Sequence, residues 1–228
     1  MDMHVAVSKR ELESVCADLQ YTLVKGAQPA PRAGGRDLPS SSPSDLCIGK
    51  VQSEGNDHVE MQRGEGDAAV QVCDDTAALS ERIVHLTSDT KLDEHARNRE
   101  NLGQAGAVQV LIALLRRDAT LGGDTVVRVL KAIHCVAYGN SDNKEKLAAG
   151  DGVATVLHTM KLHTMNAALQ AEACWCLNVA TFCCPTNKRA ARAMGAHEVF
   201  EQARRAHAME SGVQWEARDA LRRLSCWP

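Results

Sequence analysis

The sequence predicts an all-α fold, and two features of the chain support that prediction. Only 3% of the 228 residues are aromatic, and alanine, leucine and valine dominate the apolar 44%. This composition favours helices packed through small side chains over β-sheets. From about Asp67 onward the apolar residues recur at helical spacing, and that pattern itself repeats along the chain. We therefore expect a repetitive array of helices.

Charge and hydropathy narrow the classes of function. Residues 1–90 carry 8 Lys/Arg against 15 Asp/Glu, whereas residues 91–228 carry 18 against 14, so neither part is basic enough to predict nucleic-acid binding. No apolar run approaches the roughly 20 residues that span a bilayer, and the first residues lack the apolar core of a signal peptide. The nine cysteines, an odd number without regular spacing, favour a reducing compartment. We expect a soluble cytoplasmic protein, with the nucleus as a second compartment, that does not insert into membranes.

Three regions follow one another along the chain. Residues 1–25 predict an amphipathic helix, with Ser8 and Glu11 as a capping box before an apolar stripe. Residues 26–66 hold four of the six prolines and seven of the sixteen glycines but no aromatic residue, which predicts a disordered linker. Residues 67–228 form the predicted helical array, in which residues 67–87 would be the last helix of an incomplete first repeat.

Two sets of positions give the repeat its period. Asparagines at 98, 143 and 187 are spaced by 45 and 44 residues, and each precedes a glycine, at 106, 152 and 195. The apolar ends of the closing helices, at 133–137, 176–180 and 221–225, align with steps of 43 and 45 residues. A period of about 40 to 47 residues is typical of α-solenoids built from armadillo or HEAT units.

The stretch from Asn98 to Leu115 distinguishes between these two kinds of unit. It reads asparagine, an apolar residue, Ala-Gly, and then apolar positions along a second helix, and this pattern resembles the armadillo repeat family. The glycine allows a positive φ at the sharp turn between the first two helices of a repeat. The resemblance covers about three repeats in residues 88–228, and it implies a right-handed α-solenoid with a flexible N-terminal region.

Membership of this family would imply a non-enzymatic adaptor or scaffold. Its third helices line a concave surface that binds an extended segment of another protein. Seven side chains are candidates for that surface here: Lys131, His134, Asn178, Arg218, Asp219, Arg222 and Arg223. Because cations outnumber carboxylates among them, an acidic partner segment is favoured over a basic one, although these charges are equally well explained as solvated surface groups.

A nuclear-import-type cargo adaptor is one alternative. Such members of the family carry a ladder of Trp and Asn residues four apart on the third helices. Aligned on 133, 176 and 221, the Trp positions hold Lys131, Cys174 and Asp219, and the Asn positions hold Cys135, Asn178 and Arg223. Only Asn178 matches, and Trp175 is expected to pack between repeats because it is one residue out of register.

A zinc- or redox-responsive cysteine cluster is a second alternative. Four cysteines fall within residues 174–184, but C-x-C on a helix points its thiols in different directions, which disfavours a metal site. No pattern of a phosphate-binding loop, nucleophile elbow or zinc-protease helix occurs in the sequence. We expect no catalytic residues, no metal and no cofactor.

Both ends of the array raise questions about packing. The apolar stripe of the N-terminal helix needs a surface to cover it, so we expect this helix to fold back as a cap on the array. At the other end, no further repeat follows to cover Leu221, Leu224 and Trp227. This face would then be open to self-association.

Overall fold

The computed structural model describes residues 8–25, 57–88, 92–117 and 121–225, and in these ranges it contains eleven helices and no strand. The prediction of an all-α chain is confirmed for this part of the molecule. The helices are α1 (Lys9–Lys25), α2 (Asp57–Ser88), α3 (Leu92–Gln104), α4 (Ala107–Leu115), α5 (Gly123–Ala137), α6 (Ser141–Ala149), α7 (Gly152–Leu162), α8 (Ala167–Thr181), α9 (Pro185–Ala193), α10 (Ala196–Ala206) and α11 (Ser211–Ser225).

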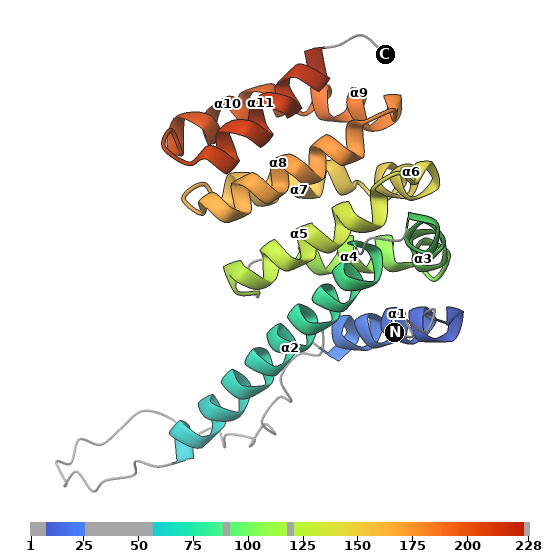
Figure 1. The fold of residues 1–228 in the computed structure, drawn as a ribbon. Helices are drawn as coiled ribbons and strands as arrows, with labels where there is room; N and C mark the ends of the chain where they lie inside the picture. Colours follow the sequence, from blue (N-terminus) through green and yellow to red (C-terminus); the bar gives the residue numbers. More distant parts are fainter. Residues whose placement is uncertain (1–7, 26–56, 89–91, 118–120, 226–228) are drawn as a thin grey trace, which may run out of the picture.

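From α3 onward the helices form three successive triplets that stack on one another (Figure 1). The third helices α5, α8 and α11 lie side by side in one layer, and α2 packs against α5 as the first member of this row. The second helices, α4, α7 and α10, lie behind them, and the short first helices, α3, α6 and α9, lie along one edge. Each triplet thus buries one face only by contacting its neighbours.

The last two triplets repeat with a period of 44 residues at every helix boundary. The helices α6, α7 and α8 begin at residues 141, 152 and 167, and α9, α10 and α11 begin at 185, 196 and 211. Their last residues keep the same offset, from 149, 162 and 181 to 193, 206 and 225. The helix α5 precedes α8 by the same 44 residues at both ends.

Buried asparagines join each triplet to the one before it. Asn143 donates from Nδ2 to the carbonyl oxygens of Arg99 and Val136, and Asn187 donates in the same way to those of Lys144 and Ala180. Each asparagine therefore bonds to the residue seven positions before it and to the equivalent first helix of the preceding triplet. Val136 and Ala180 lie in the last turns of α5 and α8, where carbonyls lack intrahelical partners, so these bonds satisfy them.

The turn between the first and second helices uses a left-handed residue in each triplet. Gly106 and Gly195 have φ of 88° and 72°, as the sequence predicts. In the middle triplet the prediction of Gly152 is wrong, because Asp151 takes this conformation with φ of 53° and Gly152 is already the first residue of α7. All three turns hold two residues between the helices, so the left-handed position falls eight residues after the repeated asparagine, where the middle triplet has Asp151 instead of a glycine. At Gly152, a Cβ would instead come within 3.0 Å of the Leu147 carbonyl oxygen.

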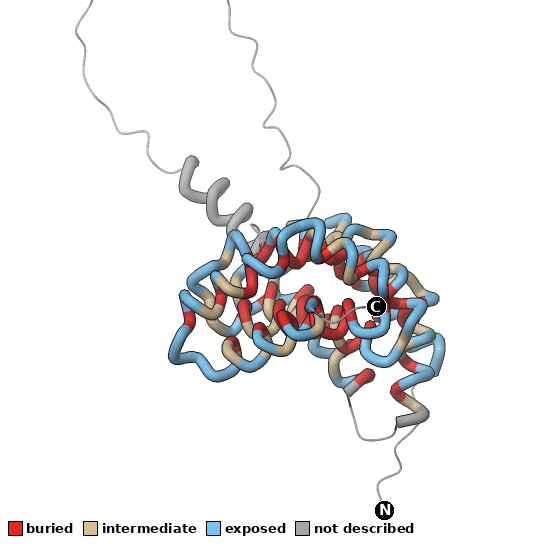
Figure 2. Tube along the Cα trace, turned by 90° about the horizontal axis from the view of Figure 1, so that it is seen from above, coloured by how far each residue is buried: buried red, intermediate tan, exposed pale blue. Residues whose placement is uncertain are grey.

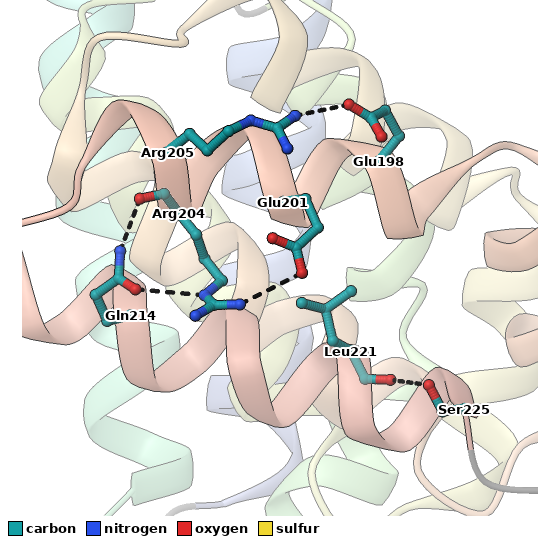
Figure 3. Close-up of polar contacts among 7 residues, drawn as sticks. All are labelled: Glu198, Glu201, Arg204, Arg205, Gln214, Leu221 and Ser225. Carbon is teal, nitrogen blue, oxygen red and sulfur yellow. Dashed lines mark hydrogen bonds and ion pairs between the residues drawn. The ribbon is translucent and has the colours of Figure 1, made fainter.

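Glutamines join the second and third helices of the last two triplets. Gln170 donates from Nε2 to the carbonyl oxygens of Met160 and His163, and Gln214 does the same to those of Arg204 and His207. Figure 3 shows Gln214 between α10 and α11, where its amide oxygen also accepts from Nε of Arg204. The two glutamines are 44 residues apart, so this polar contact repeats with the fold.

The N-terminal helix α1 packs against α2, α3 and α4 at the lower end of the stack in Figure 1. Its apolar stripe is buried there, since Leu12 and Leu19 are both 0% exposed, and the Ser8 hydroxyl accepts from the backbone N–H of Glu11 as the capping box predicts. The helix α2 begins at Asp57, ten residues before the expected start of the array at residue 67. Residues 26–56, which make up most of the predicted linker, lie outside the described residues.

Buried residues lie where neighbouring helices face each other, and exposed residues lie on the outer sides of the stack (Figure 2). At the C-terminal end, the expectation of uncovered apolar residues is wrong for Leu221 and Leu224, which are 8% and 5% exposed. They are buried because α11 packs against both α8 and α10. Trp227 lies outside the described residues. No described helix combines the length and apolar character needed to cross a membrane.

Candidate functional site

A groove of about 1010 Å³ runs along α8 and α11, with the end of α5 and the start of α6 at its far edge. It therefore crosses the layer of third helices seen in Figure 1. The side chains and backbone that line it come from Tyr138, Gly139, Ser141, Lys144, Trp175, Asn178, Val179, Phe182, Cys183, Trp215, Glu216, Arg218, Asp219, Arg222 and Arg223.

Aromatic side chains are concentrated in this groove although the chain as a whole has few. Trp175 and Trp215 are 41% and 64% exposed, and Tyr138 and Phe182 are also exposed. Trp175 lies on α8 and Phe182 follows directly after its last residue, so both rings lie toward the end of this helix. Exposed rings gathered in a concave surface are typical of sites that bind another molecule.

Cations lie over these rings. The Arg218 guanidinium carbon is 4.5 Å from the Trp215 ring centroid, and that of Arg223 is 4.7 Å from the Phe182 ring centroid. The ammonium of Lys144 lies 5.2 Å from the same Phe182 ring. Such contacts orient the rings and the cations together within the groove.

One carboxylate, that of Asp219, organises the α8–α11 side of the groove. Its Oδ2 accepts from Nδ2 of Asn178 and from Nε of Arg223, both at 3.0 Å, and its Oδ1 accepts from Arg222 at 2.7 Å. Burial opposes ionisation, but the hydrogen bonds and charges of Arg223 and Arg222 outweigh it and lower the pKa of Asp219 below its usual range. Asp219 is thus a charged anchor for two arginines.

The groove carries a positive balance on a chain whose net charge is −3. Four cationic side chains line it, Lys144, Arg218, Arg222 and Arg223, against the carboxylates of Glu216 and Asp219, a net charge of +2. Burial and the charges of Asp219 and Glu172 raise the pKa of Glu216, so this carboxyl group ionises less readily than usual. The local field therefore favours an anionic ligand.

A partly buried ion pair lies between α5 and α8 beside this groove. Nδ1 of His134 is 2.5 Å from Oε1 of Glu172, and the imidazole contacts the Trp175 ring with centroids 5.7 Å apart. Burial alone would lower the pKa of His134, but the hydrogen bond to Cys135 and the ion pair with Glu172 raise it to about 9. This pair connects the two helices and supports one side of Trp175.

The structure brings five of the seven candidate residues together in the groove and leaves two outside its lining. Asn178, Arg218, Asp219, Arg222 and Arg223 line it, whereas Lys131 is exposed on α5 and His134 is paired with Glu172. Asn178 is only 6% exposed, because its amide is engaged with Asp219.

The alignment used for the third helices is wrong by one residue at α8. The bonds from Asn143 and Asn187 make Val136 and Ala180 equivalent, so Leu177 rather than Cys176 corresponds to Ile133. In this register Trp175, not Cys174, aligns with Lys131, and Val179, not Asn178, aligns with Cys135. Trp175 lies exposed in the groove and not between repeats, which corrects that expectation as well.

Ten lining residues were absent from the sequence-based set, among them Tyr138, Lys144, Phe182 and Trp215. Tyr138 and Phe182 each follow directly after a third helix, 44 residues apart, which is the one regularity that could have identified them. Lys144 follows the repeated Asn143 as Arg99 follows Asn98, whereas Trp215 carries no comparable signal, because only the packing of α11 against α8 brings it to the groove.

The cysteines give no metal-binding arrangement in the described residues, where no group of three or more His, Cys, Asp or Glu side chains could hold an ion. Cys174 and Cys176 are buried, and burial raises the pKa of both thiols far above the usual range. Cys183 is exposed and lines the groove, whereas Cys184 beside it is buried. The four thiols of residues 174–184 therefore do not share one environment.

Comparisons with known proteins do not identify a family. No protein-family model and no curated protein matches the sequence. Among solved structures, the chain is similar to an engineered protein that was a target of the Northeast Structural Genomics Consortium, with a TM-score of 0.49 and 22% sequence identity. The match covers 69% of this chain and 66% of the engineered protein, just under two thirds of its length.

Proposed function

We propose that this chain is a right-handed α-solenoid of armadillo-type repeats that acts as a non-enzymatic protein-interaction module. The repeat of 44 residues, the left-handed turn in each triplet and the row of third helices support the architecture. The observation that carries the function is the groove along α8 and α11, which combines exposed aromatic faces with a net positive charge.

The partner is an extended segment of another protein that carries acidic and apolar side chains. Its apolar residues would contact Trp175 and Trp215, and its carboxylates would meet Arg218 and Arg222, whose charged ends are accessible to solvent. An extended peptide suits a long open groove because it offers side chains at regular intervals. A basic segment of the kind bound by import adaptors would meet the same cations with unfavourable charge.

Fluorescence anisotropy with labelled peptides of equal length tests this function. The peptides share their apolar residues and differ only in carrying acidic, neutral or basic residues between them. We expect the acidic peptides to bind most tightly. Their affinity should fall as salt is added, because salt ions screen the exposed cations. Equal affinity for all three sets, or a preference for the basic set, would contradict the proposal.

Two charge reversals make the test specific for the groove. Arg218→Glu should lower the affinity for the acidic peptides by about three- to tenfold, since it removes a cation beside Trp215 and adds a repelling charge. Arg205→Glu is the matched control, because Arg205 pairs with Glu198 on α10 outside the groove lining (Figure 3). The control should bind as the unchanged protein does.

A further inference from the structure

The strongest unexplained feature of the groove is the cation pair over Phe182. Lys144 belongs to α6 and Arg223 to α11, yet both place their charge over the one ring, at 5.2 and 4.7 Å from its centroid. Their charges lie close enough that Arg223 contributes to lowering the pKa of Lys144, although burial is the larger cause. Two like charges held together in this way favour an anion between them.

Lys144 is the more unusual member of the pair. It is only 5% exposed, yet among the described residues its ammonium forms no ion pair with a carboxylate. Its one hydrogen bond runs from Nζ to the carbonyl oxygen of Phe182 at 2.8 Å. Because an ammonium carries three N–H donors, two remain for a ligand.

The preceding triplet has an equivalent contact between one cation and one aromatic ring. There Arg99 follows the buried Asn98 as Lys144 follows Asn143, and its guanidinium carbon lies 5.3 Å from the Tyr138 ring centroid. A cation over an aromatic ring is therefore common to both triplets. In the described part of the chain, a second cation lies over the ring at Phe182 but not at Tyr138; it is Arg223, from α11, which packs against α8.

The neighbouring carboxylate does not neutralise the pair. Asp219 accepts from Asn178, Arg222 and Arg223 at once, so one negative charge is shared by two guanidinium groups. Glu216, the other carboxylate of the groove lining, forms no ion pair with Lys144 in the described structure. The α6 side of the Phe182 ring thus keeps an uncompensated positive charge inside the groove.

We infer that Lys144, Arg223 and Phe182 form a subsite for one anionic side chain of the bound segment, with a phosphate monoester preferred over a carboxylate. This inference rests on the proposed function and names the chemistry recognised at one end of its groove. A phosphate carries nearly two negative charges at neutral pH and three acceptor oxygens, so it matches both cations and the two available donors of Lys144. A carboxylate supplies one charge and leaves the pair only half compensated.

Titration of the whole protein with phenyl phosphate and with phenylacetate, followed by NMR, tests the subsite directly. The signals to follow are the Nε–Hε group of Arg223 and the backbone amides of Phe182 and Cys183. We expect saturable shifts with both ligands and about fivefold or more tighter binding of phenyl phosphate. Phenyl phosphate should also bind more weakly below pH 6, where it loses its second charge.

Three variants separate this subsite from nonspecific attraction to a basic groove. Lys144→Met should abolish the saturable shifts, and Lys144→Arg, which keeps the charge, should retain them. Lys161→Met removes an exposed charge on α7 outside the groove lining and should leave binding unchanged. Thermal melting establishes that each variant is folded. If Lys144→Met does not fold, Arg223→Met provides the same test from α11.

The results distinguish failure of the subsite from failure of the proposed function. Absence of saturable shifts, or identical binding to folded Lys144→Met, overturns the subsite even where acidic peptides bind the groove. Tighter binding of phenylacetate than of phenyl phosphate overturns the phosphate preference. If phenyl phosphate binds saturably but no acidic peptide binds, the subsite is supported as an anion site. The proposed protein-interaction function is then rejected.

Discussion

Asn178 on α8 and Asp219 on α11 are joined by a hydrogen bond of 3.0 Å across the groove, and this contact fixes how the last two third helices present their charges. Asn178 is almost fully buried, while Asp219 extends the contact to Arg222 and Arg223. A single polar bridge between neighbouring repeats therefore connects α8 to α11 and holds two candidate binding residues in place.

Asp219→Asn should weaken this bridge while leaving the size and shape of the side chain at position 219 almost unchanged. The substitution removes the charge that Arg222 and Arg223 share, and we expect the free energy of unfolding to fall by about 1 kcal/mol, since part of the side chain remains solvated. Urea denaturation measures the change. Asp74→Asn, at an exposed position of α2, is the control and should be nearly neutral. If Asp219→Asn lowers the free energy of unfolding no more than the control does, the bridge contributes little to stability.

Asn187→Ala should be strongly destabilising. Asn187 is 0% exposed and donates to the carbonyl oxygens of Lys144 and Ala180, so its loss leaves two buried acceptors without that donor. We expect a decrease of about 2 to 3 kcal/mol in the free energy of unfolding, measured by urea denaturation. Gln109→Ala, an exposed residue of α4, should change it by less than about 0.5 kcal/mol. A small effect at both positions would rule out this role for the repeated asparagines.

The His134–Glu172 pair should make stability depend on pH in the alkaline range. The pKa of His134 is raised from 6.5 to about 9, so its stabilising contribution is complete below pH 6.5 and is lost as the pH rises through about 9. Urea denaturation at both ends of this range should show a larger loss for the unchanged protein than for His134→Gln. Cys135, Glu172 and Trp175 also face the imidazole, so the comparison between the two proteins isolates its titration. Parallel pH profiles would contradict the assignment.

Leu19→Ala should show whether α1 belongs to the folded unit. Leu19 is 0% exposed where α1 meets the first triplet, so we expect a loss of about 2 to 5 kcal/mol in the free energy of unfolding. Tyr21→Ala, on the exposed face of the same helix, provides the control. An unchanged unfolding curve for Leu19→Ala would show that α1 does not dock stably in solution.

Asp151→Gly should stabilise the protein, an outcome opposite to that of most substitutions. Asp151 has φ of 53°, a conformation that glycine adopts without a Cβ penalty, and its ion pair with Arg116 is long and exposed. We expect the melting temperature to rise, with a gain of about 0.5 to 1 kcal/mol in the free energy of unfolding. Asp142→Gly within α6 should lower stability by about 1 kcal/mol because it weakens a helix. A destabilising Asp151→Gly would show that the ion pair outweighs the backbone strain.

Much of the local structure follows from the sequence, because helix formation depends on short-range patterns. The apolar stripe of α1, the capping Ser8 and the left-handed Gly106 and Gly195 are all set by residues a few positions apart. The recurrence of Asn98, Asn143 and Asn187 likewise identifies the repeat. It does not identify every turn residue, since the left-handed position eight residues after Asn143 holds Asp151, one residue before the expected Gly152.

The sequence indicated five of the charged and polar lining residues, but the tertiary structure determined how the groove is completed. Successive helical residues differ in direction by about 100°, so aligning on Cys176 instead of Leu177 moved Trp175 from the groove to the contact between repeats. Lys144, Phe182 and Arg223 lie as many as 79 residues apart, and they meet only because α6 and α11 both contact the end of α8. The sequence by itself determined the helices and their repetition, since these depend on local propensity and periodicity. The site depended on how the repeats stack, because residues from different repeats become neighbours only through packing.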